Sequence, residues 1–161
     1  MAGLYGAIHD QLSFTIAPEY FTKFKYGQFG FDPAWFGGHR PTVAVIGCLA
    51  TWWVGMLIGF FLGGTALFQP DARDMREAIV RGVAITLITA VSSAVLGLCY
   101  GWLLLNGAPP GWHLPGDVVD THAFLAVGSM HNCSYGGGVL GLILALADME
   151  WRRNKRKAVR T

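Results

Sequence analysis

Charged residues are scarce in this chain of 161 residues. They make up 14% of the sequence and hydrophobic residues make up 53%, whereas a soluble domain carries roughly 25% charged residues. Apolar side chains in such excess need lipid as a solvent in addition to a protein interior. The composition therefore predicts an integral membrane protein.

The motifs of several enzyme classes are also missing. The sequence contains no paired-histidine zinc motif, no phosphate-binding glycine loop and no nucleophile elbow. The three cysteines are an odd number at scattered spacing, which is no disulfide framework. Residues 1–40 lack a basic start followed by an apolar run, so we expect no cleavable signal peptide. An enzymatic function is the least supported class.

Three apolar stretches exceed the roughly 20 residues that a helix needs to cross the hydrocarbon core. They run from about 42 to 68, 83 to 105 and 122 to 147. Proline and glycine between them leave backbone groups that need water, which places the breaks outside the lipid. We expect an all-α membrane protein with three transmembrane helices in a domain spanning 41–149.

The distribution of basic residues predicts the orientation of these helices. Six of the twelve basic residues lie in the last ten positions. They are Arg152, Arg153, Lys155, Arg156, Lys157 and Arg160. Three more, Arg73, Arg76 and Arg81, lie in the first loop, and the loop 106–121 has none. By the positive-inside rule the segment 150–161 is a cytoplasmic tail and the N-terminus lies outside. A nucleic-acid partner is not expected, because basic runs beside apolar helices usually anchor topology.

The first forty residues predict an amphipathic cap at the outer membrane interface. Pro18 and Glu19 are typical of a helix start. Aromatic residues then alternate with Lys23 and Lys25, a pattern that suits the headgroup region.

One segment resembles a known group of proteins. Residues 6–29, GAIHDQLSFTIAPEYFTKFKYGQF, contain His-Asp-Gln followed by Pro-Glu-Tyr-Phe-Thr-Lys-Phe. This segment resembles the opening of an uncharacterised family of small bacterial integral membrane proteins. The resemblance implies a location in the bacterial inner membrane and implies no activity. It directs attention to His9, Asp10 and Glu19.

Small residues recur four apart along the expected spans, which lets helices approach closely in lipid. The clearest are Gly55, Gly59, Gly63, Ser93, Gly97, Gly101, Gly137 and Gly141. We interpret them as packing seams, chiefly between the first and second spans or between protomers. Lining of a pore is the alternative interpretation.

The third span is polar on two faces. His122 and Cys133 share one face, and His131 and Tyr135 lie on the opposite one. A helix that faces lipid should be apolar there. The pattern therefore predicts that protein covers both faces, through self-association or another membrane protein.

His131 lies roughly 15 Å into its span at the helical rise. An ionisable residue at that depth indicates a functional site, although a neutral histidine bonded to a neighbouring hydroxyl is an equal alternative. The candidate polar site comprises His9, Asp10, Glu19, His122, His131, Asn132 and Tyr135.

Three functions remain open. In the first, the protein is a subunit or scaffold in which His9, Asp10 and Glu19 bond to the loop around His113, Asp117 and Asp120. In the second, it handles protons or binds a transition metal such as copper or zinc. The ligands would then come from His122, His131, Cys133, Cys48, Cys99 and Met130. In the third, an oligomer moves an ion or small solute past His131 and Asn132.

Overall fold

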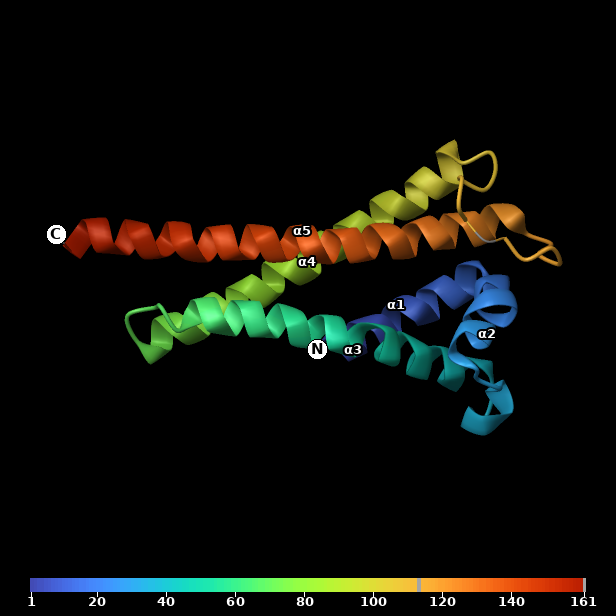
Figure 1. Ribbon diagram of the computed structural model, residues 1–161, viewed down its shortest axis with the longest axis horizontal. Coiled ribbons are helices and arrows are strands. Elements are labelled where there is room, and N and C mark those ends of the chain that lie inside the picture. Colours follow the sequence, from blue (N-terminus) through green and yellow to red (C-terminus); the bar gives the residue numbers. More distant parts are fainter. Residues whose placement is uncertain (113, 161) are drawn as a thin grey trace.

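The computed structural model describes residues 1–112 and 114–160, and all of their secondary structure is helical (Figure 1). The elements are α1 (Ala2–Ile16), a π-helical turn η1 (Tyr20–Lys25), α2 (Tyr26–Phe29), a 3₁₀ turn η2 (Pro33–Phe36), α3 (His39–Ala66), α4 (Ala72–Leu104) and α5 (Thr121–Arg160). The prediction of an all-α chain is confirmed.

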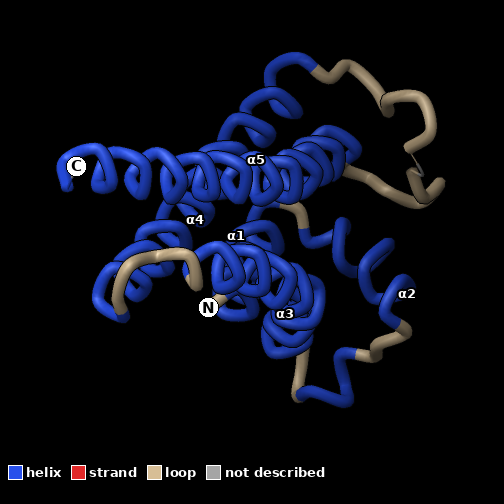
Figure 2. The backbone as a smooth tube through the Cα atoms, turned by 60° about the vertical axis from the view of Figure 1, so that its left-hand side comes forward, coloured by secondary structure: helices blue, strands red, loops and turns tan. Residues whose placement is uncertain are grey.

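The long helices form two pairs. α1 lies along the first half of α3, and α4 crosses α5 along much of its length (Figures 1 and 2). A short turn joins α3 to α4 at the far end from α1. There Leu62 and Ala66 pack with Ala145 and Met149 of α5. The two pairs thus meet at this turn and diverge toward the other end.

α3 and α4 are long and apolar enough to cross a membrane. Only 17% of the most apolar stretch of α3 and 28% of that of α4 is buried, so most of each apolar stretch lies on the outside of the molecule. Among the described helices, α5 does not pass the same hydropathy test, because its middle carries the polar run 129–135. Two candidate spans are present, and the third remains a prediction.

Two helix boundaries differ from the expectation. α4 begins at Ala72 instead of near position 83, because the Asp71 side chain caps it by accepting from the Asp74 backbone N–H at 2.8 Å. α5 continues without a break to Arg160, so the expected tail is the end of a long helix. Arg156 pairs with Asp74 and holds this end against α4.

The small-residue seams form with other partners than expected. A Cβ on Gly97 would lie 2.6 Å from the Ser129 carbonyl oxygen. Gly137 and Gly141 similarly face Ser93 and Thr86 of α4. The small-residue stripe of α4 therefore packs on α5, and the prediction that it chiefly faces α3 is wrong.

The small residues of α3 pack on α1. Gly55 meets Ala2, and Thr51 donates its hydroxyl to the Ala2 carbonyl at 2.8 Å. No described atom outside the helix lies within 4 Å of the Cβ position of Gly59 or Gly63. These two glycines are thus not part of a seam within the chain.

The N-terminal segment differs from the expected interfacial cap. Residues 2–16 form a helix packed lengthwise on α3, because Gly6 and Gly47 let the two backbones touch. Only the following residues cover the end of the bundle. Glycines with positive φ end its short helices, at 67° for Gly30 and 81° for Gly37.

α5 is covered on both faces within the chain. Tyr20 and Phe21 pack against Phe124 and Val127 on one side, and α4 covers the other. The prediction that both polar faces are shielded holds for residues 123–131, whereas His122, Asn132 and Tyr135 are exposed. The chain itself supplies the cover, so self-association remains a separate prediction.

Candidate functional site

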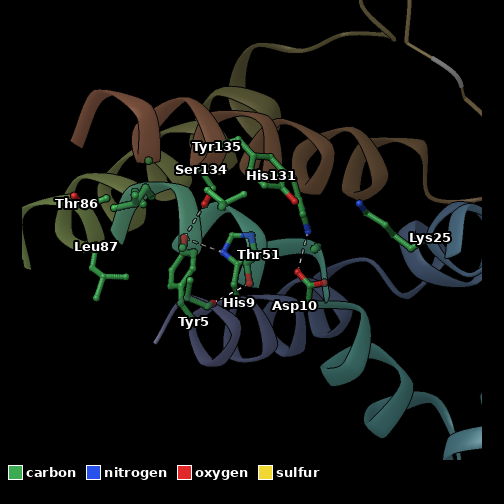
Figure 3. A pocket seen from close by; sticks show the side chains of 17 residues that line it. Tyr5, His9, Asp10, Lys25, Thr51, Thr86, Leu87, His131, Ser134 and Tyr135 are labelled. Atoms are coloured by element: carbon green, nitrogen blue, oxygen red, sulfur yellow. Dashed lines mark hydrogen bonds and ion pairs between the residues drawn. The ribbon is translucent and has the colours of Figure 1, made fainter. Parts of the chain in front are cut away.

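A polar cluster lies between the two helix pairs (Figure 3). α1 contributes His9 and Asp10, and α5 contributes His131. The His131 Nε2 atom lies 3.1 Å from Asp10 Oδ1. Asp10 is 4% exposed and His131 is 5% exposed, so this contact is removed from bulk water.

The hydrogen bonds of His131 define the state of its ring. Its Nδ1 atom lies 2.9 Å from the Val127 carbonyl oxygen. A carbonyl only accepts, so Nδ1 carries the hydrogen and donates it. In a neutral ring Nε2 then has only a lone pair. A lone pair and a carboxylate oxygen at 3.1 Å require a cation between them, either a proton or a metal ion.

His9 lies beside this pair with a free ring nitrogen. The His9 and His131 rings meet edge to face with centroids 4.8 Å apart. The His9 Nδ1 atom is 3.5 Å from the Tyr5 hydroxyl, and the buried Nε2 atom of His9 has no hydrogen-bond partner among the described residues. Burial, together with His131 and against the opposing effect of Asp10, lowers the pKa of His9 to about 4. The ring is therefore neutral at pH 7.

The three residues have the donor atoms of a metal site. One ligand atom from each of His9, Asp10 and His131 lies within 4.8 Å of the others. In the part of the chain that the structure describes, this is the only such group of three histidine, cysteine or acidic residues. Two imidazoles and one carboxylate suit zinc, copper, iron or nickel.

Hydroxyl and aromatic groups hold the cluster in place. The Tyr5 hydroxyl lies 2.7 Å from Ser134 Oγ and joins α1 to α5. The Tyr20 ring lies 4.8 Å from the His131 ring. Tyr5 and Ser134 were not among the predicted site residues. The spacing of Tyr5, His9 and Ser13 at intervals of four, which aligns three polar groups on one helix face, is the signal that could have identified Tyr5.

Lys25 lies at the rim of the cluster and was also missed. It is 7% exposed, and its Nζ atom lies 5.8 Å from the Tyr20 ring centroid and 5.7 Å from that of Phe24. Its ammonium group makes no hydrogen bond or ion pair with the residues that the structure describes. Burial lowers the pKa of Lys25, and Asp10 opposes this.

The other expected site residues lie elsewhere. His122 Nε2 donates to the Trp102 carbonyl at 2.8 Å, on the α4 side of α5. Cys133 packs on Gly97, and Cys48 packs on Gly3. The structure thus combines His131 with His9 and Asp10, and not with His122, Cys48, Cys99 or Cys133. His9, Asp10 and His131 were all predicted as site residues, but their direct contact was not, because the N-terminal helix was expected outside the bundle.

The remaining candidates have separate surroundings. Glu19 accepts the backbone N–H groups of Val119 and Asp120 at 3.1 and 2.8 Å, which confirms its expected contact with that loop. The expected loop contacts of His9 and Asp10 are wrong, because both residues face His131. His113 lies outside the described residues. Two more candidates are on the surface: Asn132 is exposed and Tyr135 is 39% exposed.

Comparison of the chain with models of known protein families, with curated proteins and with solved structures gives no match.

Proposed function

We propose that the protein is an integral membrane protein that holds a divalent transition metal at His9, Asp10 and His131. α3, α4 and the apolar part of α5 would be its three spans, with the N-terminus outside and the C-terminus in the cytoplasm of a bacterium. The spans are supported by the apolar exposed surfaces of α3 and α4. The metal is supported by the lone pair of His131 that faces Asp10.

The surroundings of His131 match those of a histidine that binds metal. Such a histidine usually donates its second ring N–H to a carbonyl or carboxylate, which orients the ring and raises the basicity of the ligand nitrogen. Val127 accepts this hydrogen bond from His131. The His9 Nε2 atom is buried without a partner, and an unpaired buried polar atom costs free energy that a metal bond would recover.

The spacing of His131 and Asp10 suits one ion, and His9 has to move closer to reach it. A tetrahedral zinc ion holds its nitrogen and oxygen donors about 3.3 Å apart. The separation of His131 and Asp10, 3.1 Å, already fits this value. The donor atoms of the three residues lie up to 4.8 Å apart, and the weak contact of His9 with the Tyr5 hydroxyl at 3.5 Å does not oppose its approach. Three protein ligands would leave a fourth position open toward the adjoining pocket.

Metal analysis of the purified protein tests the proposal. We expect about one metal ion per chain in the wild type, in keeping with three ligands and one open position, and less than a tenth of that in His131→Ala. His122→Ala is the matched control, because His122 bonds to the Trp102 carbonyl on the other side of α5, and it should keep the metal. A wild-type protein that is metal-free and does not bind added Zn²⁺ or Co²⁺ would overturn the proposal. The cation between His131 and Asp10 would then be a proton.

Self-association is a second proposal, which Asn132 supports. Its amide faces outward from α5 next to the exposed Gly136. In lipid an outward amide finds hydrogen-bond partners only on another helix. Asn132→Cys, in a background with the three native cysteines replaced by alanine, should form a cross-linked dimer in membranes. Leu96→Cys on the exposed face of α4 is the control. Equal cross-linking at both positions, or none at position 132, would contradict the proposal.

A further inference from the structure

A pocket adjoins the polar cluster and extends away from it between α3 and α4 (Figure 3). Its polar end is formed by His9, Asp10, His131 and Lys25. Its other walls are mainly apolar and include Val54 and Ile58 of α3 and Leu87 and Ala90 of α4. The pocket therefore has one polar end, and the rest of it is mainly apolar.

Lys25 is the feature of this pocket that the metal site does not explain. Its side chain reaches from η1 toward His131 (Figure 3), and it is 7% exposed without an anionic partner among the described residues. Contacts with the faces of Tyr20 and Phe24 offset part of the cost of burying a cation. A buried ammonium group is otherwise expected to be paired with an anion.

The nearest carboxylate is already engaged. Asp10 contacts His131 and, under the proposed function, binds the metal. A divalent ion and the Lys25 ammonium group together exceed the single negative charge of Asp10. Positive charge thus remains in excess at the polar end of the pocket, and a bound anion would neutralise it.

The size of the site limits the anion. The pocket has a cavity volume of about 70 Å³, which suits a small head group at its polar end. Phosphate has more oxygen atoms to satisfy and is typically bound by several arginine or lysine donors. Lys25 is the single basic chain among the lining residues. A carboxylate, with one charge and two oxygen atoms, fits this set of donors better.

The apolar part of the pocket continues to the surface. A second hollow, lined by Trp52, Gly59 and Val83, shares Ile58 and Leu87 with the first. If α3 and α4 cross the membrane, this path opens toward lipid acyl chains. A ligand with an aliphatic chain would enter from the bilayer and keep its chain in this path.

We propose that the pocket binds a carboxylate with an aliphatic chain, such as a fatty acid. The carboxylate would lie between the Lys25 ammonium group and the open position of the metal, with the chain along α3 and α4. This inference rests on the proposed metal site, whose three residues also line the pocket.

The test uses the purified, metal-loaded full chain in a maltoside detergent, with octanoate as the probe and calorimetry as the readout. The wild type should bind octanoate at least about 10-fold more tightly than octanol or acetate, because octanol lacks the charge and acetate lacks the chain. Lys25→Met should weaken octanoate binding about 10-fold with an unchanged metal content. Lys23→Met is the control, since Lys23 is on the surface and pairs with Asp117.

The outcomes separate the two proposals, because metal content is measured on every sample. A metal-loaded wild type that does not bind octanoate overturns the carboxylate site alone. A wild type that binds no metal overturns the proposed function, whether or not it binds octanoate. Equal binding of octanol excludes a role for the charge, and equal binding of acetate excludes a role for the chain. If Lys25→Met does not fold, Lys25→Arg and Lys25→Gln replace it, and only the arginine variant should retain octanoate binding.

Discussion

His131 Nε2 and Asp10 Oδ1 face each other at 3.1 Å between α5 and α1, while the Val127 carbonyl takes the hydrogen of the other ring nitrogen. This relationship joins two segments that are distant in the sequence. It also leaves two electron-rich atoms in contact away from water, which is the arrangement that a cation stabilises.

Replacing Asp10 separates the role of charge from that of shape. Asp10→Asn retains the size of the side chain, and its amide N–H can donate to the lone pair of His131. We therefore expect the free energy of unfolding to change by less than about 1.5 kcal/mol, while metal affinity falls at least about 100-fold. Thermal unfolding in detergent and metal titration measure the two effects. Unchanged metal affinity in Asp10→Asn would exclude the carboxylate as a ligand.

The glycine seam between α4 and α5 predicts a steric effect. Gly97→Leu places a side chain where the Ser129 carbonyl and Cys133 now lie. We expect a loss of about 1–3 kcal/mol of stability or more, as is usual for overpacking. Gly59→Leu is the matched control on α3, because no described atom outside the helix lies within 4 Å of its Cβ position. Equal unfolding temperatures for both variants would contradict the observed packing.

The helices themselves could be predicted from the sequence because apolar runs and their breaks are local signals. The turns of α4 before position 83 were not predicted, because their polar side chains are typical of a loop. In the structure Arg81 pairs with Asp148 of α5 at 2.8 Å, and this tertiary contact is not visible in the sequence. The stripe through Gly97 and Gly101 was identified as a packing seam, but helical periodicity does not specify which helix the stripe packs on.

The proposed metal site was only half predictable from the sequence. The expected depth of His131 in the third predicted span marked it as unusual, and the resemblance suggested for residues 6–29 directed attention to His9 and Asp10. Their meeting depends on the packing of α1 along α3 through Gly6 and Gly47. An amphipathic pattern with aromatic residues and lysines is equally typical of a helix at the membrane surface, so the sequence alone favoured the wrong location.

The proposed orientation predicts which end of α5 is accessible from each side of the membrane. In a background without native cysteines, Lys155→Cys should react with an impermeant maleimide only after the membrane is opened. Asp117→Cys, in the loop before α5, should react in intact cells, because that loop is assigned to the outside. The reverse pattern would reverse the proposed topology, and labelling of both positions in intact cells would show that the cells were leaky.

Asp148 predicts a pH-dependent contribution to stability at the C-terminal end of the bundle. It accepts from Arg81 at 2.8 Å and from Arg152 at 3.1 Å. Burial alone would raise the pKa of Asp148, but the hydrogen bonds from the two arginines outweigh it and lower the pKa in the folded protein. A lowered pKa means that the stabilisation is present above the unfolded value, about 3.9, and is lost as the pH falls through the folded value.

Asp148→Asn should therefore be less stable than the wild type at pH 7, by about 0.5–1 kcal/mol because both arginines are partly exposed. The difference should shrink as the pH falls below about 4, where the wild-type carboxylate also becomes protonated. Glu77→Gln on the exposed side of α4 is the control and should show no such trend. Chemical unfolding in detergent at several pH values measures the stability difference between each variant and the wild type. A difference between wild type and Asp148→Asn that stays constant from pH 7 to pH 3 would show that the carboxylate charge does not stabilise the α4–α5 pair.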